Sequence, residues 1–191
     1  MKKIFLCFFL LFLSVKFSYA EEIISKIEKN WNQINTMSGR FMQIDPDEKI
    51  STGNFYFLKP YQSKFIYDNE NETVITNINL LRIIDKDGYQ TNSYAIGNNV
   101  LKKILSTEFR LSEEFDIVGF ETFELDYKIS IEYKNDKSKT KVTIYFDKDT
   151  LDLKKWEIYD EFDNKTVLEF TNIKKNIFIS QNLFAVKYRK N

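Results

Sequence analysis

The residues that could carry out chemistry are few, and most of them lie in short acidic stretches. Asp85, Asp87 and Gly88 begin like a calcium-binding loop, but the glycine comes two residues too early for an EF-hand and no glutamate follows at the required spacing. Further acidic residues stand between apolar runs, over residues 147–149 and 160–163. We interpret all three stretches as hairpin turns, because aspartate is a favoured turn residue.

The usual catalytic groups are missing. Histidine is absent from all 191 residues, which excludes a Ser-His-Asp triad, a Cys-His pair and most zinc sites. The single cysteine is Cys7, and neither a glycine-rich phosphate loop nor a helical Ser-x-x-Lys motif occurs. We therefore expect a protein that is not an enzyme and has no cofactor or metal; a secreted hydrolase is the disfavoured alternative.

The N-terminus has the composition of an export signal. Lys2 and Lys3 give the chain a basic start, residues 4–15 form an apolar run too short to span a bilayer, and residues 18–20 have the small-x-small form of a cleavage site. Cleavage would leave residues 21–191, with 25 basic against 28 acidic side chains and a net charge of −3. We expect one domain in the periplasm without the basic surface of a nucleic-acid binder, and an uncleaved anchor is the alternative.

The remaining chain reads as one helix followed by a long series of strands. Residues 22–36 place isoleucines and Trp31 at steps of three and four, which predicts an amphipathic helix. A second helical stretch is expected near 98–107, and residues 111–114 could form a further helical turn. Alternating apolar residues between turn signals predict strands at 38–45, 51–58, 63–68, 72–77, 80–85, 89–95, 115–122, 125–133, 139–147, 152–160 and 165–173.

This spacing predicts a meandering antiparallel sheet rather than βαβ units. After loss of residues 1–20 the chain would keep 13 Phe, 10 Tyr and both Trp, a heavy aromatic load beside five Gly. A large, open, curved sheet with a wide apolar face would accommodate such side chains, whereas a tightly closed barrel needs small residues at its corners.

Three consecutive segments resemble the outer-membrane lipoprotein carrier protein (LolA) family. They are Ser38–Gln43 (SGRFMQ), Ser51–Pro60 (STGNFYFLKP) and Lys64–Tyr67 (KFIY), which match the family's F-x-Q, G-x-[FL]-x-[LIV]-x-[RK]-P and F/W-x-Y patterns in order. Four later segments also resemble the family in order and residue type: Leu80–Asp85, Asn99–Leu105, Asp147–Asp160 and Asn182–Phe184. Of these, Asp147–Asp160 resembles the alphaproteobacterial branch of the family.

The resemblance implies an α+β fold, an incomplete and strongly curved antiparallel β-barrel (half-barrel) with a helical lid over an apolar cavity. It implies a monomeric periplasmic carrier that takes triacylated lipoproteins from an inner-membrane ATP-driven lipoprotein-releasing complex to the outer membrane. Whether an outer-membrane acceptor receives them is left open. The alternative of another class is a periplasmic lipid- or lipoprotein-binding sensor or structural domain of the same fold. An acceptor lipoprotein would need a cysteine at position 21, where this chain has Glu21.

The expected cavity combines sheet and lid residues. Alternation places Phe55, Phe57 and Lys59 on one face of a strand. The family's arginine before the proline closes the lid, and Lys59 stands at that position, so we expect Lys59 to act as the lid latch; the alternative is a lysine that extends its ammonium group into water. The expected cavity residues are Phe41, Phe55, Phe57, Phe65, Tyr67, Leu101, Ile104, Leu105 and Trp156.

Overall fold

The computed structural model describes residues 19–69, 71–96, 100–134 and 140–188. Most of the expected export signal therefore lies outside the described residues, as do the starts of the expected second helix and of the expected strand at 139–147.

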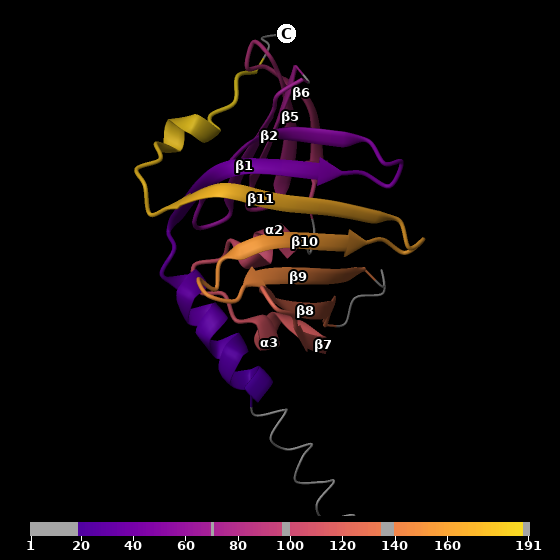
Figure 1. The fold of residues 1–191 in the computed structure, drawn as a ribbon. Helices are drawn as coiled ribbons and strands as arrows, with labels where there is room; N and C mark the ends of the chain where they lie inside the picture. Colours follow the sequence, from indigo (N-terminus) through magenta and orange to yellow (C-terminus); the bar gives the residue numbers. More distant parts are fainter. Residues whose placement is uncertain (1–18, 70, 97–99, 135–139, 189–191) are drawn as a thin grey trace, which may run out of the picture.

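In the part of the chain that the structure describes, eleven antiparallel strands form one open sheet (Figure 1). Successive strands pair with each other along two meanders, and the first strand pairs with the last to join them. The strands at the two ends, β6 and β7, are the edges, which confirms the incomplete barrel. The strands are β1 (Thr36–Ile44), β2 (Ile50–Leu58), β3 (Gln62–Tyr67), β4 (Glu72–Asn77), β5 (Leu80–Asp85), β6 (Gln90–Ala95), β7 (Phe115–Thr122), β8 (Asp126–Tyr133), β9 (Lys141–Asp147), β10 (Leu153–Tyr159) and β11 (Lys165–Lys175).

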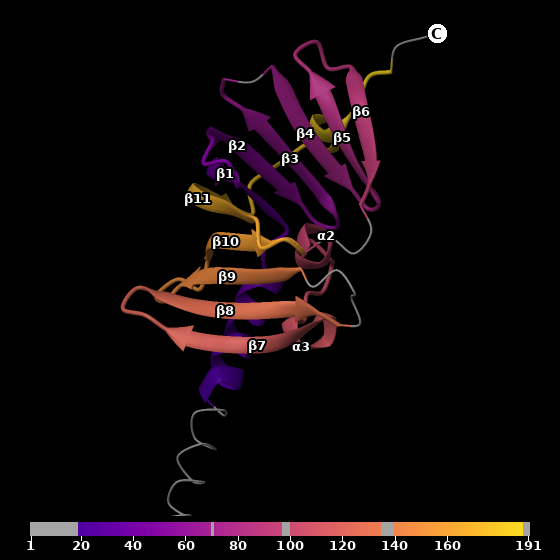
Figure 2. The ribbon, with the colours of Figure 1, turned by 90° about the vertical axis from the view of Figure 1, so that its right-hand side faces the viewer.

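Every expected strand is present, with bounds within two residues of the sequence-based ones. The alternation that predicted them is visible in β2, where Ser51, Gly53, Phe55 and Phe57 are buried and the residues between them are partly exposed. Figure 2 shows the strong twist of the sheet, with β2–β6 inclined steeply to β7–β9. Register shifts within β1, β7 and β10 add local irregularities of the β-bulge type, which increase the twist of a strand.

Within the described residues, three helical elements precede the last strand of the sheet. An N-terminal helix covers residues 19–32, α2 spans Val100–Ile104 and α3 spans Leu111–Glu114. The expected helix at 22–36 is too long at its C-terminal end, because residues 33–35 form a turn and Thr36 already begins β1. The expected stretch at 98–107 likewise ends early, at Ile104.

Two apolar clusters lie on opposite faces of the sheet. The larger one joins side chains of the N-terminal helix, α2 and one face of the strands, which we call the inner face. The smaller one lies on the outer face, where Ile75 and Ile84 pack with Phe184 of the 3-10 helix η1 (Gln181–Phe184). Among the described residues, no helix combines the length and the apolar character needed to cross a membrane.

Candidate functional site

The larger apolar cluster contains all nine residues that the sequence indicated for a cavity. Seven of them are at most 6% exposed, and Tyr67 and Leu101 are partly buried against the same cluster. They come from β1, β2, β3 and β10, from α2, and from Leu105 directly after α2. The sheet and the two helices therefore bring these side chains together in direct packing, and whether they receive a ligand remains a prediction.

Aromatic rings form the centre of this cluster. Phe55 and Phe57 lie with ring centroids 4.8 Å apart, and Phe41 contacts Phe65 and Tyr67 edge to face at 5.2 and 5.1 Å. The ring of Phe170, which the sequence did not single out, is 4.9 Å from that of Phe55. Such edge-to-face contacts add to the stabilisation from buried area.

Two glycines make room for these rings. Gly53 lies opposite Phe41 on the paired strands β1 and β2, and a Cβ added there would be 2.5 Å from the Phe41 ring. Gly39 lies opposite Phe55 in the same way, with 2.8 Å to its ring. Both glycines belong to the segments that carried the resemblance, so one function of those motifs is to let aromatic rings lie flat on the inner face.

The other face of β2 serves a different purpose. Tyr56 and Leu58 alternate with the inner-face rings and pack against the smaller cluster under the C-terminal segment. Both faces of this strand are therefore apolar: one belongs to the larger cluster and the other to the smaller cluster on the outer face.

The N-terminal helix and α2 cover the inner face and are tied to each other by a tryptophan. The Nε1 atom of Trp31 donates to the carbonyl oxygen of Ile104 at 2.7 Å, and both residues are buried. The amide of Tyr61, just after β2, donates to the carbonyl oxygen of Leu105 at 2.8 Å. Because these bonds join the N-terminal helix to α2 and α2 to the sheet, the two helices form one cover.

The chain that follows α2 also belongs to the cover, and the helical turn expected at 111–114 is present as α3. Phe109 and Leu111 are 2% and 0% exposed, although they precede or begin only the four-residue helix α3. The Asn32 side chain donates to the Phe109 carbonyl and accepts from its amide, at 2.9 and 2.8 Å. Glu28 accepts from the amide of Leu111 at 2.6 Å. Polar side chains of the N-terminal helix thus hold an irregular segment in place. Because the apolar residues of this segment follow no regular spacing, the sequence pattern does not show that they are buried.

Lys59 lies where the cover meets the sheet. Its Nζ atom donates to the carbonyl oxygen of Trp31 at 2.7 Å and lies 4.8 Å from the centre of the Trp31 ring. Carbonyl groups at a helix C-terminus attract cations, and indole faces do so as well. Burial lowers the pKa of Lys59 to about 8, so desolvation opposes the charge that these contacts favour. The ammonium group thus bonds to the helix rather than pointing into bulk water, and its role as a latch stays a prediction.

The acidic stretches act as turn residues in the structure. The side chain of Asp85 accepts from the amides of Asp87 and Tyr89, and Asp147 accepts from those of Asp149 and Thr150. The described residues hold no group of three or more acidic or sulfur side chains suited to a metal ion.

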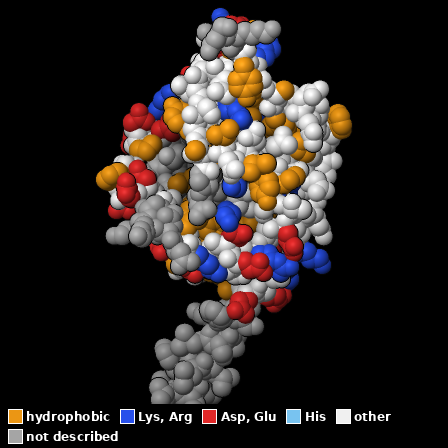
Figure 3. All heavy atoms as spheres, turned by 180° about the vertical axis from the view of Figure 1, so that it is seen from behind, with side chains coloured by type: hydrophobic (Ala, Val, Ile, Leu, Met, Phe, Trp, Pro, Cys, Tyr) orange, Lys and Arg blue, Asp and Glu red, His pale blue; other side chains and the backbone are white. Residues whose placement is uncertain are grey.

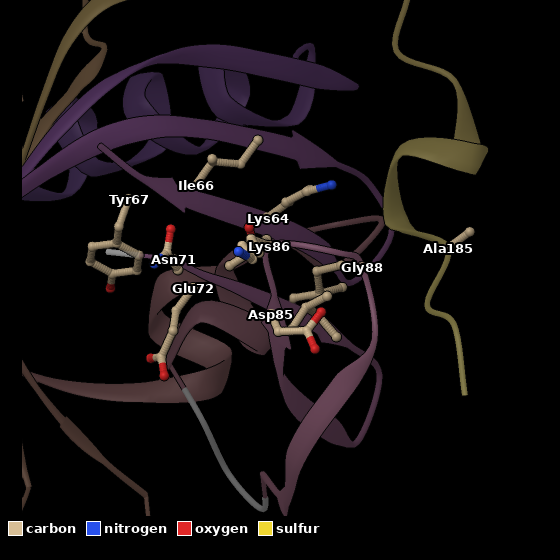
Figure 4. Close-up of a pocket in the computed structure, with 12 residues that line it drawn as sticks. Lys64, Ile66, Tyr67, Asn71, Glu72, Asp85, Lys86, Gly88 and Ala185 are labelled. Carbon is tan, nitrogen blue, oxygen red and sulfur yellow. The ribbon is translucent and has the colours of Figure 1, made fainter. Parts of the chain in front are cut away.

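Two pockets open away from the centre of the cluster. A cleft of about 640 Å³ lies between the first turns of the N-terminal helix and the edge strand β7, and apolar residues of the cluster form its base: Ile24, Phe115, Ile117 and Phe120. A smaller pocket of about 320 Å³ lies on the outer face of β3–β5 (Figure 4). Its Lys64 points toward the C-terminal segment and donates to the Leu183 carbonyl at 2.9 Å, which ties that segment to the sheet.

Exposed apolar side chains elsewhere are dispersed. Figure 3 shows hydrophobic side chains reaching the rear surface in several separate groups among polar ones. The most exposed are Phe178, Phe162 and Leu125, from three different segments.

An open antiparallel sheet with an apolar inner face under short helices defines a half-barrel of the lipoprotein-carrier type. The sequence pattern of the outer membrane lipoprotein carrier protein LolA family matches residues 32–187, and the chain belongs to this family. It is 27% identical to the outer-membrane lipoprotein carrier protein of Francisella tularensis subsp. tularensis (strain WY96-3418), over all of this chain and 95% of that protein. Proteins of this family are carriers that bind lipoproteins.

Solved structures share the fold. An uncharacterised conserved protein from Thermus thermophilus superposes with a TM-score of 0.52 at 11% identity, covering 90% of this chain and 99% of that one. A DUF1329 family protein from Desulfovibrio piger ATCC 29098 gives 0.51 at 13% identity, covering 88% and 96%.

Proposed function

We propose that this protein is a non-catalytic periplasmic carrier that shields the acyl chains of lipoproteins and shuttles them from the inner to the outer membrane. Its cargo would be triacylated lipoproteins supplied by an inner-membrane ATP-driven releasing complex. The observation that supports this most is the large apolar cluster between the inner face and a cover made of two short helices. Membership of the lipoprotein carrier family supports it as well.

The energetics explain why such a protein needs a cavity and no catalytic group. Three acyl chains hold about 45 methylenes, each worth about 0.8 kcal/mol when removed from water, or roughly 35 kcal/mol together. A free lipoprotein would therefore not leave a membrane for the periplasm. Extraction has to be driven by another component, and the carrier has to replace the lipid environment.

The cover is suited to closing when cargo is absent. Eight of its apolar side chains are buried: Ile23, Ile24, Ile27, Trp31, Ile34, Val100, Ile104 and Leu105. At about 1.5–3 kcal/mol each, exposing all eight to water would cost about 12–24 kcal/mol. An empty carrier therefore stays closed. When acyl chains replace the contacts between the cover and the sheet, the side chains of the cover stay out of water and most of the cost of opening is removed.

Lys59 fits the role of a latch in this scheme. It holds the C-terminal end of the N-terminal helix by one hydrogen bond and one ring contact, which are few enough to break when cargo enters. In Lys59→Leu both contacts are lost, so the closed state becomes less stable relative to the open state. Cargo should then load but leave slowly. That variant should accumulate as a carrier–lipoprotein complex in the periplasm, whereas Lys59→Arg should release cargo like the wild type; normal release by Lys59→Leu would exclude the latch.

A spheroplast assay tests the carrier function. Protein purified from the periplasm of an expressing strain is added to energised spheroplasts that synthesise a triacylated lipoprotein. We expect the lipoprotein to appear in the supernatant in a complex with the carrier, and only while ATP is available. A variant lipoprotein whose acylated cysteine is replaced by serine is the control and should form no complex. Equal recovery of both forms would show that the acyl chains are not what the protein binds.

A further inference from the structure

The two tryptophans of the chain differ in one respect. Both are 2% exposed, but only Trp31 has an acceptor for its indole N–H, the carbonyl oxygen of Ile104. The Nε1 atom of Trp156 is buried and has no hydrogen-bond partner in the part of the chain that the structure describes. Buried donors are almost always paired, because an unpaired one loses its bond to water without replacement.

Trp156 lies on the inner face at the middle of β10. Its directly opposed neighbours are Ile144 on β9 and Leu168 on β11, which are 0% and 9% exposed. Opposed residues of antiparallel strands share a face, and all three belong to the large apolar cluster. The ring of Phe170 stands edge to face at 5.0 Å. The unpaired N–H therefore sits among hydrocarbon side chains, in the cluster that would receive the cargo.

We propose that the indole N–H of Trp156 donates a hydrogen bond to a carbonyl oxygen of the cargo's acyl groups. This rests on the proposed carrier function and adds a chemical preference to it: acyl chains linked as esters or amides over chains without a carbonyl. The indole is a donor only, so its ligand must supply an acceptor. A charged acceptor would be costly among these apolar side chains, and the neutral carbonyl is the acceptor that every acyl group brings.

The competing use of this donor is a contact with the face of the Phe170 ring. The two rings are at 85° to each other, a geometry that would also allow a weak N–H···π bond. This alternative predicts no preference for carbonyl-bearing chains, since the donor would gain nothing from a ligand.

Binding of two matched lipopeptides distinguishes these possibilities. One carries two chains in ester linkage to its glyceryl group, and the other carries the same chains in ether linkage. We expect the wild type to bind the ester form about tenfold more tightly than the ether form, as one buried hydrogen bond allows. In Trp156→Phe, which keeps an aromatic ring but removes the donor, this ratio should fall to about one.

The indole proton signals of the wild type give a second readout that needs no variant. Two indole signals are expected, one for each tryptophan, and the ester lipopeptide should move the Trp156 signal downfield relative to the ether lipopeptide. The Trp31 signal should respond to both alike and serves as the internal control. Equal ester-to-ether ratios in wild type and Trp156→Phe, or the same Trp156 signal with both ligands, would overturn the proposal while leaving the carrier function intact. Failure of the wild type to bind either lipopeptide would overturn both.

Discussion

The latch lysine makes a prediction about pH that follows from its burial. The variant is Lys59→Met, which keeps a long apolar stem and removes the ammonium group. In the folded protein burial lowers the pKa of Lys59 to about 8, against 10.5 for an ordinary lysine. The unfolded chain therefore holds one proton more than the folded chain between about pH 8 and pH 10.5.

The sign of the effect follows from this difference. Below pH 8 both states are protonated, and the full cost of burying the charge destabilises the folded state. Above pH 8 the folded state loses the proton first, so the free energy of unfolding rises with pH by at most about 1.4 kcal/mol per pH unit. Between pH 7.5 and 9.5 this amounts to about 2 kcal/mol, and about 1–2 kcal/mol after allowance for the partial exposure of the side chain.

Urea denaturation of wild type and Lys59→Met at pH 7.5 and 9.5 checks the prediction. The wild type should gain about 1–2 kcal/mol of unfolding free energy relative to the variant at the higher pH. Other titrating groups are common to both proteins and cancel in the comparison. The matched control is Lys26→Met, which removes an ammonium group from the exposed side of the N-terminal helix. Parallel behaviour of Lys59→Met and the wild type would refute the burial of this ammonium group.

Three further substitutions test the cluster and its cover. Phe57→Ala empties a buried ring site and should lower stability by about 3–5 kcal/mol and weaken binding of a fluorescent fatty-acyl probe, whereas Phe178→Ala, at a ring 93% exposed, should change neither. Trp31→Phe removes the bond between the two covering helices and should cost about 1–2 kcal/mol in urea denaturation. Gly53→Ala would place a Cβ 2.1 Å from a backbone oxygen of β3 and should cost roughly 1–3 kcal/mol or more in the same assay; Gly119→Ala, with its nearest neighbour at 3.4 Å, should cost much less.

The sheet could be predicted from the sequence because each strand carries its own signal. Period-two apolar residues and the turn residues between them are local, and they predicted the bounds of the eleven described strands to within two residues. The placement of Phe55 and Phe57 on the inner face followed from the same alternation. The open order of the sheet followed from the family resemblance together with the aromatic content.

The cover could be predicted only in part, since its structure depends on contacts far apart in the chain. Phe109 and Leu111 are buried because Asn32 and Glu28 hold their backbone, and no local pattern encodes that. The acceptor of Lys59 is the carbonyl oxygen of Trp31, and its position depends on where the N-terminal helix ends. The unpaired N–H of Trp156 was likewise invisible, because the partner of a buried indole is set by packing.

The central claim is that the inner face holds the acyl chains of a lipoprotein, and site-specific photo-crosslinking tests it most directly. Benzoylphenylalanine is introduced at the position of Tyr67, a partly buried aromatic residue against the cluster, and at the position of Phe178 as the exposed control. In cells that express a triacylated lipoprotein, irradiation should crosslink the first variant to it and leave the second unlinked. The first variant should not crosslink the same lipoprotein lacking its acylated cysteine. Crosslinking of acylated and unacylated forms alike, or none from the position of Tyr67, would contradict the account.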